Sequence, residues 1–232
     1  MRPGLRLAVL SLAICLPGAL DSQGWQKRIS ISRNRLCVTE GTIASREKNQ
    51  LEVDAPKMRA YVNAWTAQDA TARFTYLGPS KEQSPLGSGE MRRQFGLKLR
   101  AQNACNLVYV MWRFEPESRI VVSVKQNAGQ TTSAECGNRG YRNIKAERNH
   151  PVPAVRAGDA HELVAVMRGT GLAVRVDGKE VWTGDLGSEA AELNGPVGIR
   201  SDNVRLKFDL RAGQLKGPHP MYERACQAGV EE

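Results

Sequence analysis

The sequence predicts an all-β chain that folds into a two-sheet antiparallel jelly-roll sandwich with little helix. Apolar and polar residues alternate in several segments, as expected for strands that bury one face. Turn signals recur between these segments from residue 93 to residue 212. Asp177-Gly178 is the clearest of them, because glycine tolerates the positive φ of a tight hairpin. Only residues 64–72 are compatible with a short helix.

The first residues have the composition of an export signal. Arg2 and Arg6 precede an apolar run, residues 7–16, which is too short to span a bilayer, and small residues follow it. We therefore expect a signal peptide over residues 1–19 and a secreted or periplasmic protein. A lipoprotein anchored through Cys15 is the alternative. No later run is apolar for long enough to predict a membrane span.

The rest of the chain is expected to form one domain with extensions at both ends. We predict an N-terminal segment that packs on the sandwich at residues 20–57, the sandwich itself at 58–215, and a C-terminal tail at 216–232. The full chain has a formal charge of +9, which falls to +7 when residues 1–19 and their two arginines are removed. A basic exterior of this kind suits contact with anionic glycans or cell-envelope polymers, or serves colloidal stability alone.

Four cysteines remain after the predicted cleavage, namely Cys37, Cys105, Cys136 and Cys226. An even number in an exported chain predicts two disulfides, and four cysteines allow three pairings. We favour Cys105–Cys136, which flank a block of strands, together with Cys37–Cys226, which would join the two ends of the domain. Free buried thiols are the alternative.

The strongest strand pattern runs from residue 94 to residue 126. We place Arg100 opposite Asn106, and Phe114 opposite Arg119, as simple antiparallel pairing suggests. A slip of one residue would exchange the faces of a strand. One face then carries a purely apolar set: Phe95, Leu97, Leu99, Leu107, Tyr109, Met111, Ile120, Val122 and Val124. The other carries a mixed set: Gln94, Lys98, Val108, Val110, Trp112, Val121, Ser123 and Lys125.

The mixed face is predicted to be the floor of a ligand-binding groove. Sugars present apolar C–H faces that pack on aromatic rings, and hydroxyl groups that need hydrogen-bond partners. We therefore expect Trp112 to be a stacking platform, with polar contacts from Gln94, Lys98, Ser123 and Lys125. In the alternative, residues 127–153 cover Trp112 and the ring belongs to the core.

The last strands carry a resemblance to a known superfamily. "HELVAVMRGTGLAVRVDGKEVWTGDL" is followed by "GPVGIRSDNVRLKFDLRA", so that a V-x-V-D-G hairpin precedes a G-x-V-G-I-R strand. This order resembles the closing strands of concanavalin A-like lectin/glucanase jelly rolls, and is similar to laminin-G-like modules and to the 3-keto-disaccharide hydrolase domain family. The resemblance covers residues 161–212 well and 93–127 loosely. It implies the fold, which hosts lectins, glycosidases, lyases and inert spacers.

Known catalytic patterns are not evident in the sequence. Glucanases of the resembled superfamily carry E-x-D-x-x-E, and here Glu52 and Asp54 are followed by Lys57 in place of the second glutamate. No zinc signature, nucleophile elbow or phosphate loop is visible, and the three histidines are scattered. No catalytic residue is therefore assigned, and the chain is not predicted to be an enzyme.

No cofactor or metal is predicted either. Asp177, Asp202 and Asn203 would be the oxygen ligands if calcium were bound, but the turns in which they lie explain all three. Arginine and lysine are spread among acidic residues, and no nucleic-acid-binding motif is present. We therefore expect no nucleic-acid partner.

The sequence favours an exported, noncatalytic module that binds an oligosaccharide or polysaccharide. Acidic sugars would be preferred if Arg205 and Lys207 lay on the groove face. Two alternatives remain: a glycoside-cleaving enzyme of the 3-keto-disaccharide hydrolase kind, and a structural or adhesive envelope protein.

Overall fold

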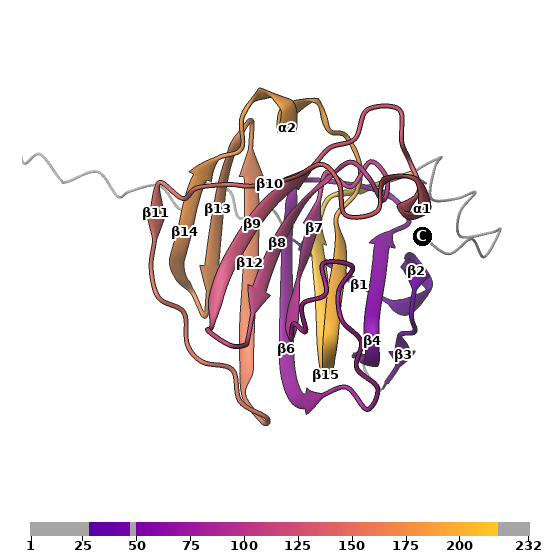
Figure 1. The fold of residues 1–232 in the computed structure, drawn as a ribbon, viewed down its shortest axis with the longest axis vertical. Coiled ribbons are helices and arrows are strands. Elements are labelled where there is room, and N and C mark those ends of the chain that lie inside the picture. Colours follow the sequence, from indigo (N-terminus) through magenta and orange to yellow (C-terminus); the bar gives the residue numbers. More distant parts are fainter. Residues whose placement is uncertain (1–27, 47–49, 218–232) are drawn as a thin grey trace, which may run out of the picture.

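The computed structural model describes residues 28–46 and 50–217, and these are built almost entirely from antiparallel strands (Figure 1). The strands are β1 (Arg28–Ile31), β2 (Leu36–Glu40), β3 (Ala44–Ser45), β4 (Leu51–Val62), β5 (Trp65–Thr66), β6 (Asp69–Pro79), β7 (Gln94–Leu99), β8 (Leu107–Arg113), β9 (Arg119–Lys125), β10 (Tyr141–Asn143), β11 (Arg148–Asn149), β12 (Ala160–Arg168), β13 (Gly171–Val176), β14 (Lys179–Asp185), β15 (Gly198–Gly213) and β16 (Leu215–Lys216). The helical elements are single turns: η1 (Arg33–Arg35), α1 (Ser133–Cys136) and α2 (Ser188–Glu192).

The strands form two layers that share β15 and β4. The layer that we call the front sheet has the order β10-β9-β8-β7-β15-β4-β2, and the layer that we call the back sheet has the order β11-β14-β13-β12-β6-β15-β4. Figure 1 shows β7, β8 and β9 lying in front of the back sheet. The all-β jelly-roll sandwich predicted from the sequence is confirmed.

The shared strand β15 passes from one sheet to the other in the middle of its length. Residues 198–202 pair with β7 of the front sheet, whereas residues 204–212 pair with β6 of the back sheet. Asn203 lies between these two segments with a φ of 54°, a left-handed conformation in which asparagine is tolerated better than most residues. The change of partner bends the sheet, which brings its two halves face to face.

The core lies between the two layers and contains aromatic side chains from both. Phe74 of β6 contacts Trp112 of β8 with ring centroids 5.6 Å apart, and Phe95 of β7 lies 5.6 Å from Phe208 of β15. Trp112 has no exposed surface. Its indole Nε1 donates a hydrogen bond of 2.9 Å to Ser118 Oγ, so the polar atom of the ring is satisfied within the fold.

The faces predicted for residues 107–113 are wrong, because both turns that bound β8 differ from the simple pairing by one residue. Leu99 pairs with Val108, and Arg113 pairs with Arg119. The first shift arises where Arg100 takes a φ of 46° and the chain leaves the ladder. The second arises because Phe114 is part of the next turn. The two shifts cancel for β9, so only β8 is inverted, and Val108, Val110 and Trp112 face the core.

Two further features of the N-terminal half differ from the sequence-based expectations. Residues 64–72 form β5 and the start of β6 instead of a helix, because β6 pairs with β12 on one side and with β15 on the other. The boundary predicted between residues 57 and 58 falls inside β4, which is hydrogen-bonded along β15. Residues 28–46 supply β1, β2 and β3, and so belong to the sheets themselves.

Replacement of Trp112 by alanine is expected to lower the free energy of unfolding by about 3–5 kcal/mol, because it empties a filled core site. Val121→Ala is the matched control, since Val121 lies half-buried on the opposite face of the same sheet, and its loss should cost about 1 kcal/mol or less. Urea denaturation followed by tryptophan fluorescence and circular dichroism measures both. Equal costs for the two variants would contradict the placement of Trp112 in the core.

Candidate functional site

A groove of 490 Å³ lies on the face of the front sheet that points away from the core. Its floor is made by side chains of β4, β7, β8, β9 and β15. Its walls are residues 86–92, from the loop between β6 and β7, and residues 133–143, from the segment that contains α1 and β10. Six of the side chains that line it are cationic, and Glu40 is the one carboxylate among the described lining residues.

A buried ion cluster holds three strands together beneath the groove. Asp202 of β15 has no exposed surface. Its carboxylate accepts hydrogen bonds from Arg59 Nη2 of β4 at 2.7 Å, from Gln94 Nε2 of β7 at 2.5 Å, and from Arg200 Nε of β15 at 2.9 Å. Each of these donors occupies part of the carboxylate, which is the arrangement that makes a buried charge tolerable.

The electrostatics of the cluster favour its fully ionised form. Burial by itself raises the pKa of Asp202, but Arg200 and Arg59 outweigh burial and hold that pKa well below its usual range. Burial likewise lowers the pKa of Arg200, whereas Asp202 and the nearby tyrosines raise it far above its ordinary value. The cluster therefore stays charged at neutral pH.

An aromatic pair covers part of the groove floor beside this cluster. Tyr109 of β8 and Tyr141 of β10 are stacked with ring centroids 5.8 Å apart and an interplanar angle of 24°. The guanidinium carbon of Arg200 lies 5.0 Å from the centre of the Tyr109 ring, in cation–π geometry. Tyr141 is 40% exposed. It is thus the aromatic ring that a ligand in the groove can reach.

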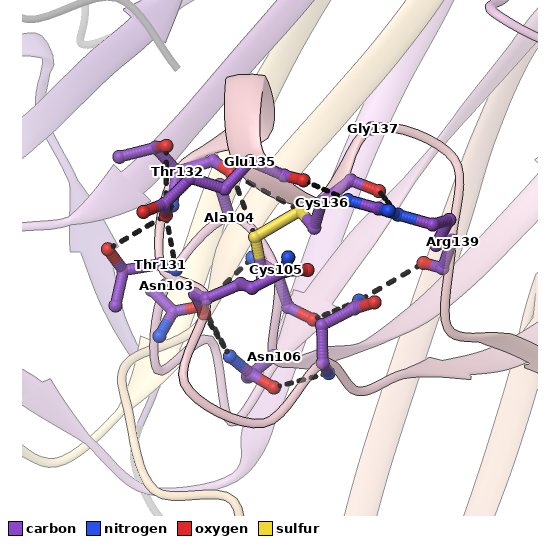
Figure 2. The surroundings of a disulfide bond; sticks show 12 residues. Asn103, Ala104, Cys105, Asn106, Thr131, Thr132, Glu135, Cys136, Gly137 and Arg139 are labelled. Atoms are coloured by element: carbon purple, nitrogen blue, oxygen red, sulfur yellow. Dashed lines mark hydrogen bonds between the residues drawn. A yellow bond between two sulfur atoms is a disulfide. The ribbon is translucent and has the colours of Figure 1, made fainter.

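One wall of the groove is fixed by the disulfide between Cys105 and Cys136 (Figure 2). Figure 2 shows the bond joining the loop after β7 to the short helix α1. Next to it, Lys125 Nζ donates to Ala104 O at 3.1 Å and to Gly137 O at 2.9 Å, so β9 is joined to both sides of the bridge. The predicted pairing of Cys105 with Cys136 is confirmed. Cys226, the partner predicted for Cys37, lies outside the described residues, as does the predicted signal peptide.

The other wall is held by Asn203. Its side-chain amide donates to Ser84 O at 2.8 Å and to Arg92 O at 3.0 Å, and its Oδ1 accepts from Ser84 N at 2.8 Å. The loop touches the disulfide-linked wall at Gly87, where an added Cβ would come within 2.2 Å of Asn138 Nδ2. The two walls are therefore in close contact at Gly87 and Asn138, which both line the groove.

The structure brings three of the five predicted ligand-binding residues to this groove and places two elsewhere. Gln94, Ser123 and Lys125 line it, although each is largely buried. Trp112 lies in the core, which excludes it as the stacking platform. Lys98 has no exposed surface, and its Nζ sits 3.7 Å from the centre of the Tyr61 ring. Neither can contact a ligand in the groove.

Sequence reasoning missed Tyr141, Arg113 and Arg200 as groove residues. Arg200 is the last residue of the G-x-V-G-I-R segment, which the sequence predicts only to be a strand. The predicted register of β8 assigned the side of Tyr109 and Arg113 to the core, whereas the observed register turns both side chains to the groove. Tyr141 lies between two tight turns in a segment without strand alternation, and no sequence signal connects it to β9.

The carboxylates compared with the glucanase motif do not form a catalytic pair in this groove. Glu52 accepts a hydrogen bond from Arg46, and Asp54 accepts one from the backbone N–H of Lys81. Lys57, in the position of the second glutamate, lines the groove as a cation. Retaining glycosidases need two carboxyl groups about 5–5.5 Å apart, and the described groove lining has Glu40 alone.

The residues considered for calcium have other roles within the described chain. Asp177 accepts from His161 Nδ1 and from the backbone N–H of Glu162, each at 2.8 Å, while Asp202 and Asn203 make the contacts given above. No group of three or more His, Cys, Asp or Glu side chains in residues 28–46 and 50–217 is placed to hold a metal ion. Over the same residues, no helix has the length and apolar character needed to cross a membrane.

Arg205 and Lys207 lie on the other side of the sandwich. They belong to the half of β15 that pairs with β6, so their side chains point outward from the back sheet. Arg205 Nη2 donates to Leu77 O at 3.1 Å, and Lys207 lines a separate depression with Arg73 and Glu162. They do not contribute to the groove.

Comparison with known proteins shows the fold. No family model matches the chain, and no curated protein matches its sequence. Among solved structures, the carbohydrate-binding module CBM66 from Bacillus subtilis is similar with a TM-score of 0.51 and 14% identity, over 75% of this chain and 91% of that chain. The Caenorhabditis elegans galectin LEC-6 has a TM-score of 0.40 and 11% identity, over 72% and 99%. Crh5 transglycosylase in complex with NAG has a TM-score of 0.46 and 12% identity, over 80% of each chain. The chain has a concanavalin A-like jelly-roll fold, as the sequence resemblance implied.

Asp202→Asn is expected to lower the free energy of unfolding at pH 7 by about 3–5 kcal/mol, because it leaves two arginines buried without their counter-charge. The depressed pKa of Asp202 stabilises the fold above the ordinary aspartate pKa of about 3.9, and this contribution is lost as the pH falls. The free energy of unfolding, measured between about pH 5 and pH 2, should therefore fall more steeply with decreasing pH for the wild type than for the variant.

Asp209→Asn is the control for this prediction. Asp209 lies on the same strand but is partly exposed on the back sheet, so its loss should change stability by about 0.5 kcal/mol or less. A similar cost for both variants would contradict the central role of the Asp202 cluster.

The double replacement of Cys105 and Cys136 by serine is expected to cost about 3 kcal/mol, because the bridge closes a loop of sequence separation 31 in the unfolded chain. When the wild type is alkylated without reductant, mass spectrometry should find both cysteines unmodified. Alkylation of either one would contradict the pairing.

Proposed function

We propose that the chain is an exported, noncatalytic module that binds an oligosaccharide or polysaccharide in the groove of the front sheet. The observation that carries this proposal is the exposed Tyr141 ring, which lies in a groove of 490 Å³ among polar and cationic side chains. An exposed aromatic face with nearby hydrogen-bond donors suits a sugar, which has one apolar face and a rim of hydroxyl groups.

The organisation of the groove supports binding more than catalysis. Asp202, which lies beneath the groove, is buried and already accepts hydrogen bonds from three side chains, so it is unavailable as a nucleophile or proton donor. The walls are fixed by a disulfide and by the hydrogen bonds of Asn203. A pre-formed groove lowers the entropy that a ligand must lose on binding. A solved structure that is similar over 75% of this chain, with a TM-score of 0.51, is a carbohydrate-binding module.

Export is supported by two independent features. The first residues have the pattern of a signal peptide, and the domain contains a disulfide, which is typical of oxidising compartments. A secreted or periplasmic protein of this kind would meet cell-envelope or extracellular glycans.

Tyr141→Ala is expected to weaken retention on the preferred glycan by about tenfold or more, since it removes the stacking surface and about 1.4 kcal/mol of binding free energy. The melting temperature should change by no more than about 2–4 °C, which corresponds to about 1 kcal/mol in a domain of this size. A glycan array with the mature protein identifies the ligand, and isothermal titration calorimetry then measures the affinity.

Two variants control this experiment. Tyr141→Phe keeps the ring and should retain most of the affinity, whereas Ile29→Ala removes an exposed apolar side chain on β1 and should leave affinity unchanged. Undiminished binding by Tyr141→Ala would show that the groove is not the site. Release of reducing sugar from a bound glycan would show that the protein is an enzyme.

A further inference from the structure

Arg113 is the feature of the groove that the proposed function does not explain. It projects from the groove face of β8, at the end that lies next to Gln94. Among the described residues it forms no salt bridge, and its Nε is buried without a hydrogen-bond partner. A buried donor left unsatisfied is costly, and structural arginines normally avoid this state.

The surroundings of Arg113 increase this cost. It lies directly opposite Arg119 in the ladder between β8 and β9, and like charges in that position are destabilising. Burial, followed by the charges of Arg92 and Arg119, lowers the pKa of Arg113 to about 10; Glu90 opposes this shift, and Arg200 adds to it. The site thus gathers positive charge around a group whose own charge is already disfavoured.

The charges of the groove as a whole do not cancel. Its lining includes six cations: Lys57, Arg59, Arg92, Arg113, Lys125 and Arg200. Within residues 28–46 and 50–217, the carboxylates that pair with these cations include Asp202, which is shared by Arg59 and Arg200, Glu40, which lies 3.6 Å from Arg59, and Glu90, which pairs with Arg92. An excess of positive charge remains, and Arg113 lies within it. Neutral hydroxyl groups of a sugar cannot compensate that charge.

We propose that the groove selects glycans that carry anionic substituents, and that Arg113, with Arg92 and Arg200 beside it, binds one such carboxylate or sulfate group. A guanidinium presents its N–H donors in a planar fork that matches either group and forms charge-assisted hydrogen bonds with it. The bound anion would satisfy Arg113 and offset its repulsion from Arg119. This inference rests on the proposed function, since it names the class of glycan bound in the same groove.

The test compares four probes by isothermal titration calorimetry with the mature protein: an oligogalacturonate, its methyl ester, a sulfated galactan oligosaccharide and a neutral cello-oligosaccharide, all of equal length. Oligogalacturonate or the sulfated probe should bind at least about tenfold more tightly than the ester and the neutral probe, as expected for hydrogen bonds to a charged group. The comparison of the two anionic probes distinguishes a carboxylate from a sulfate. Raising sodium chloride from about 50 mM to about 500 mM should weaken only anionic probes, because salt screens exposed charges.

Arg113→Gln should remove the preference for the anionic probe and most of its salt dependence. Arg113→Lys should keep part of both, because it restores the charge without the planar fork. Arg73→Gln is the matched control, since Arg73 is an exposed arginine on the back sheet, paired with Glu162. The Arg73→Gln variant should bind the anionic probe with the same affinity as the wild type. Thermal melts establish that each variant is folded.

The remaining outcomes distinguish a failure of the anion preference from a failure of glycan binding itself. If neither the oligogalacturonate nor the sulfated probe binds wild-type protein more tightly than the ester and the neutral probe do, the anion preference is overturned while glycan binding stands. The preference is also overturned if Arg113→Gln binds the anionic probe like the wild type, or if Arg73→Gln weakens it equally. If no probe and no glycan on the array is retained, the proposed function itself fails.

Discussion

The carboxylate of Asp202 is the group on which the front sheet and its groove depend. It lies at the point where β15 leaves β7 and joins β6, and it binds donors from β4, β7 and β15. A single buried anion thus joins strands that are distant in sequence. Because Arg59 and Arg200 are satisfied on the groove side of the sheet, the groove can have a charged floor without losing stability. The next residue, Asn203, fixes the loop that forms one wall. The bend of the strand and the shape of the groove therefore have a common origin.

The arginines of the groove divide into two kinds. Arg59 and Arg200 have carboxylate partners within hydrogen-bonding distance, so their positive charge is balanced and serves the fold. Arg113 faces other cations and has a buried nitrogen without a partner. Structural need does not explain such an arrangement, because an uncharged residue on β8 would avoid both costs. A bound anion would relieve the charge repulsion and the unsatisfied Nε of Arg113. This relief would favour anionic glycans over neutral ones.

The two walls of the groove and the exposed Tyr141 ring are held in place by contacts within the fold. The Cys105–Cys136 bridge and Lys125 hold one wall, and the contact of Gly87 with Asn138 joins it to the other. Tyr141 is supported on one side by Tyr109, which is in turn covered by Arg200. The exposed ring is thus supported through the same arginine that pairs with Asp202.

The sequence by itself determined the all-β class and the hairpin at Asp177-Gly178, because alternation and turn chemistry are local signals. It favoured the pairing of Cys105 with Cys136 among three possible pairings, and the structure contains that bond. It also placed Gln94, Ser123 and Lys125 correctly on the groove face, since polar residues mark one face of β7 and β9. Along β8, in contrast, apolar side chains occupy both faces, and polarity could not show which side faces the core. The left-handed Arg100 and the turn that includes Phe114 decided that register, and with it the burial of Trp112 and the exposure of Arg113 to the groove. Tyr141 reached the groove only through the pairing of β10 with β9. These features depend on contacts between distant segments, which only the tertiary structure provides.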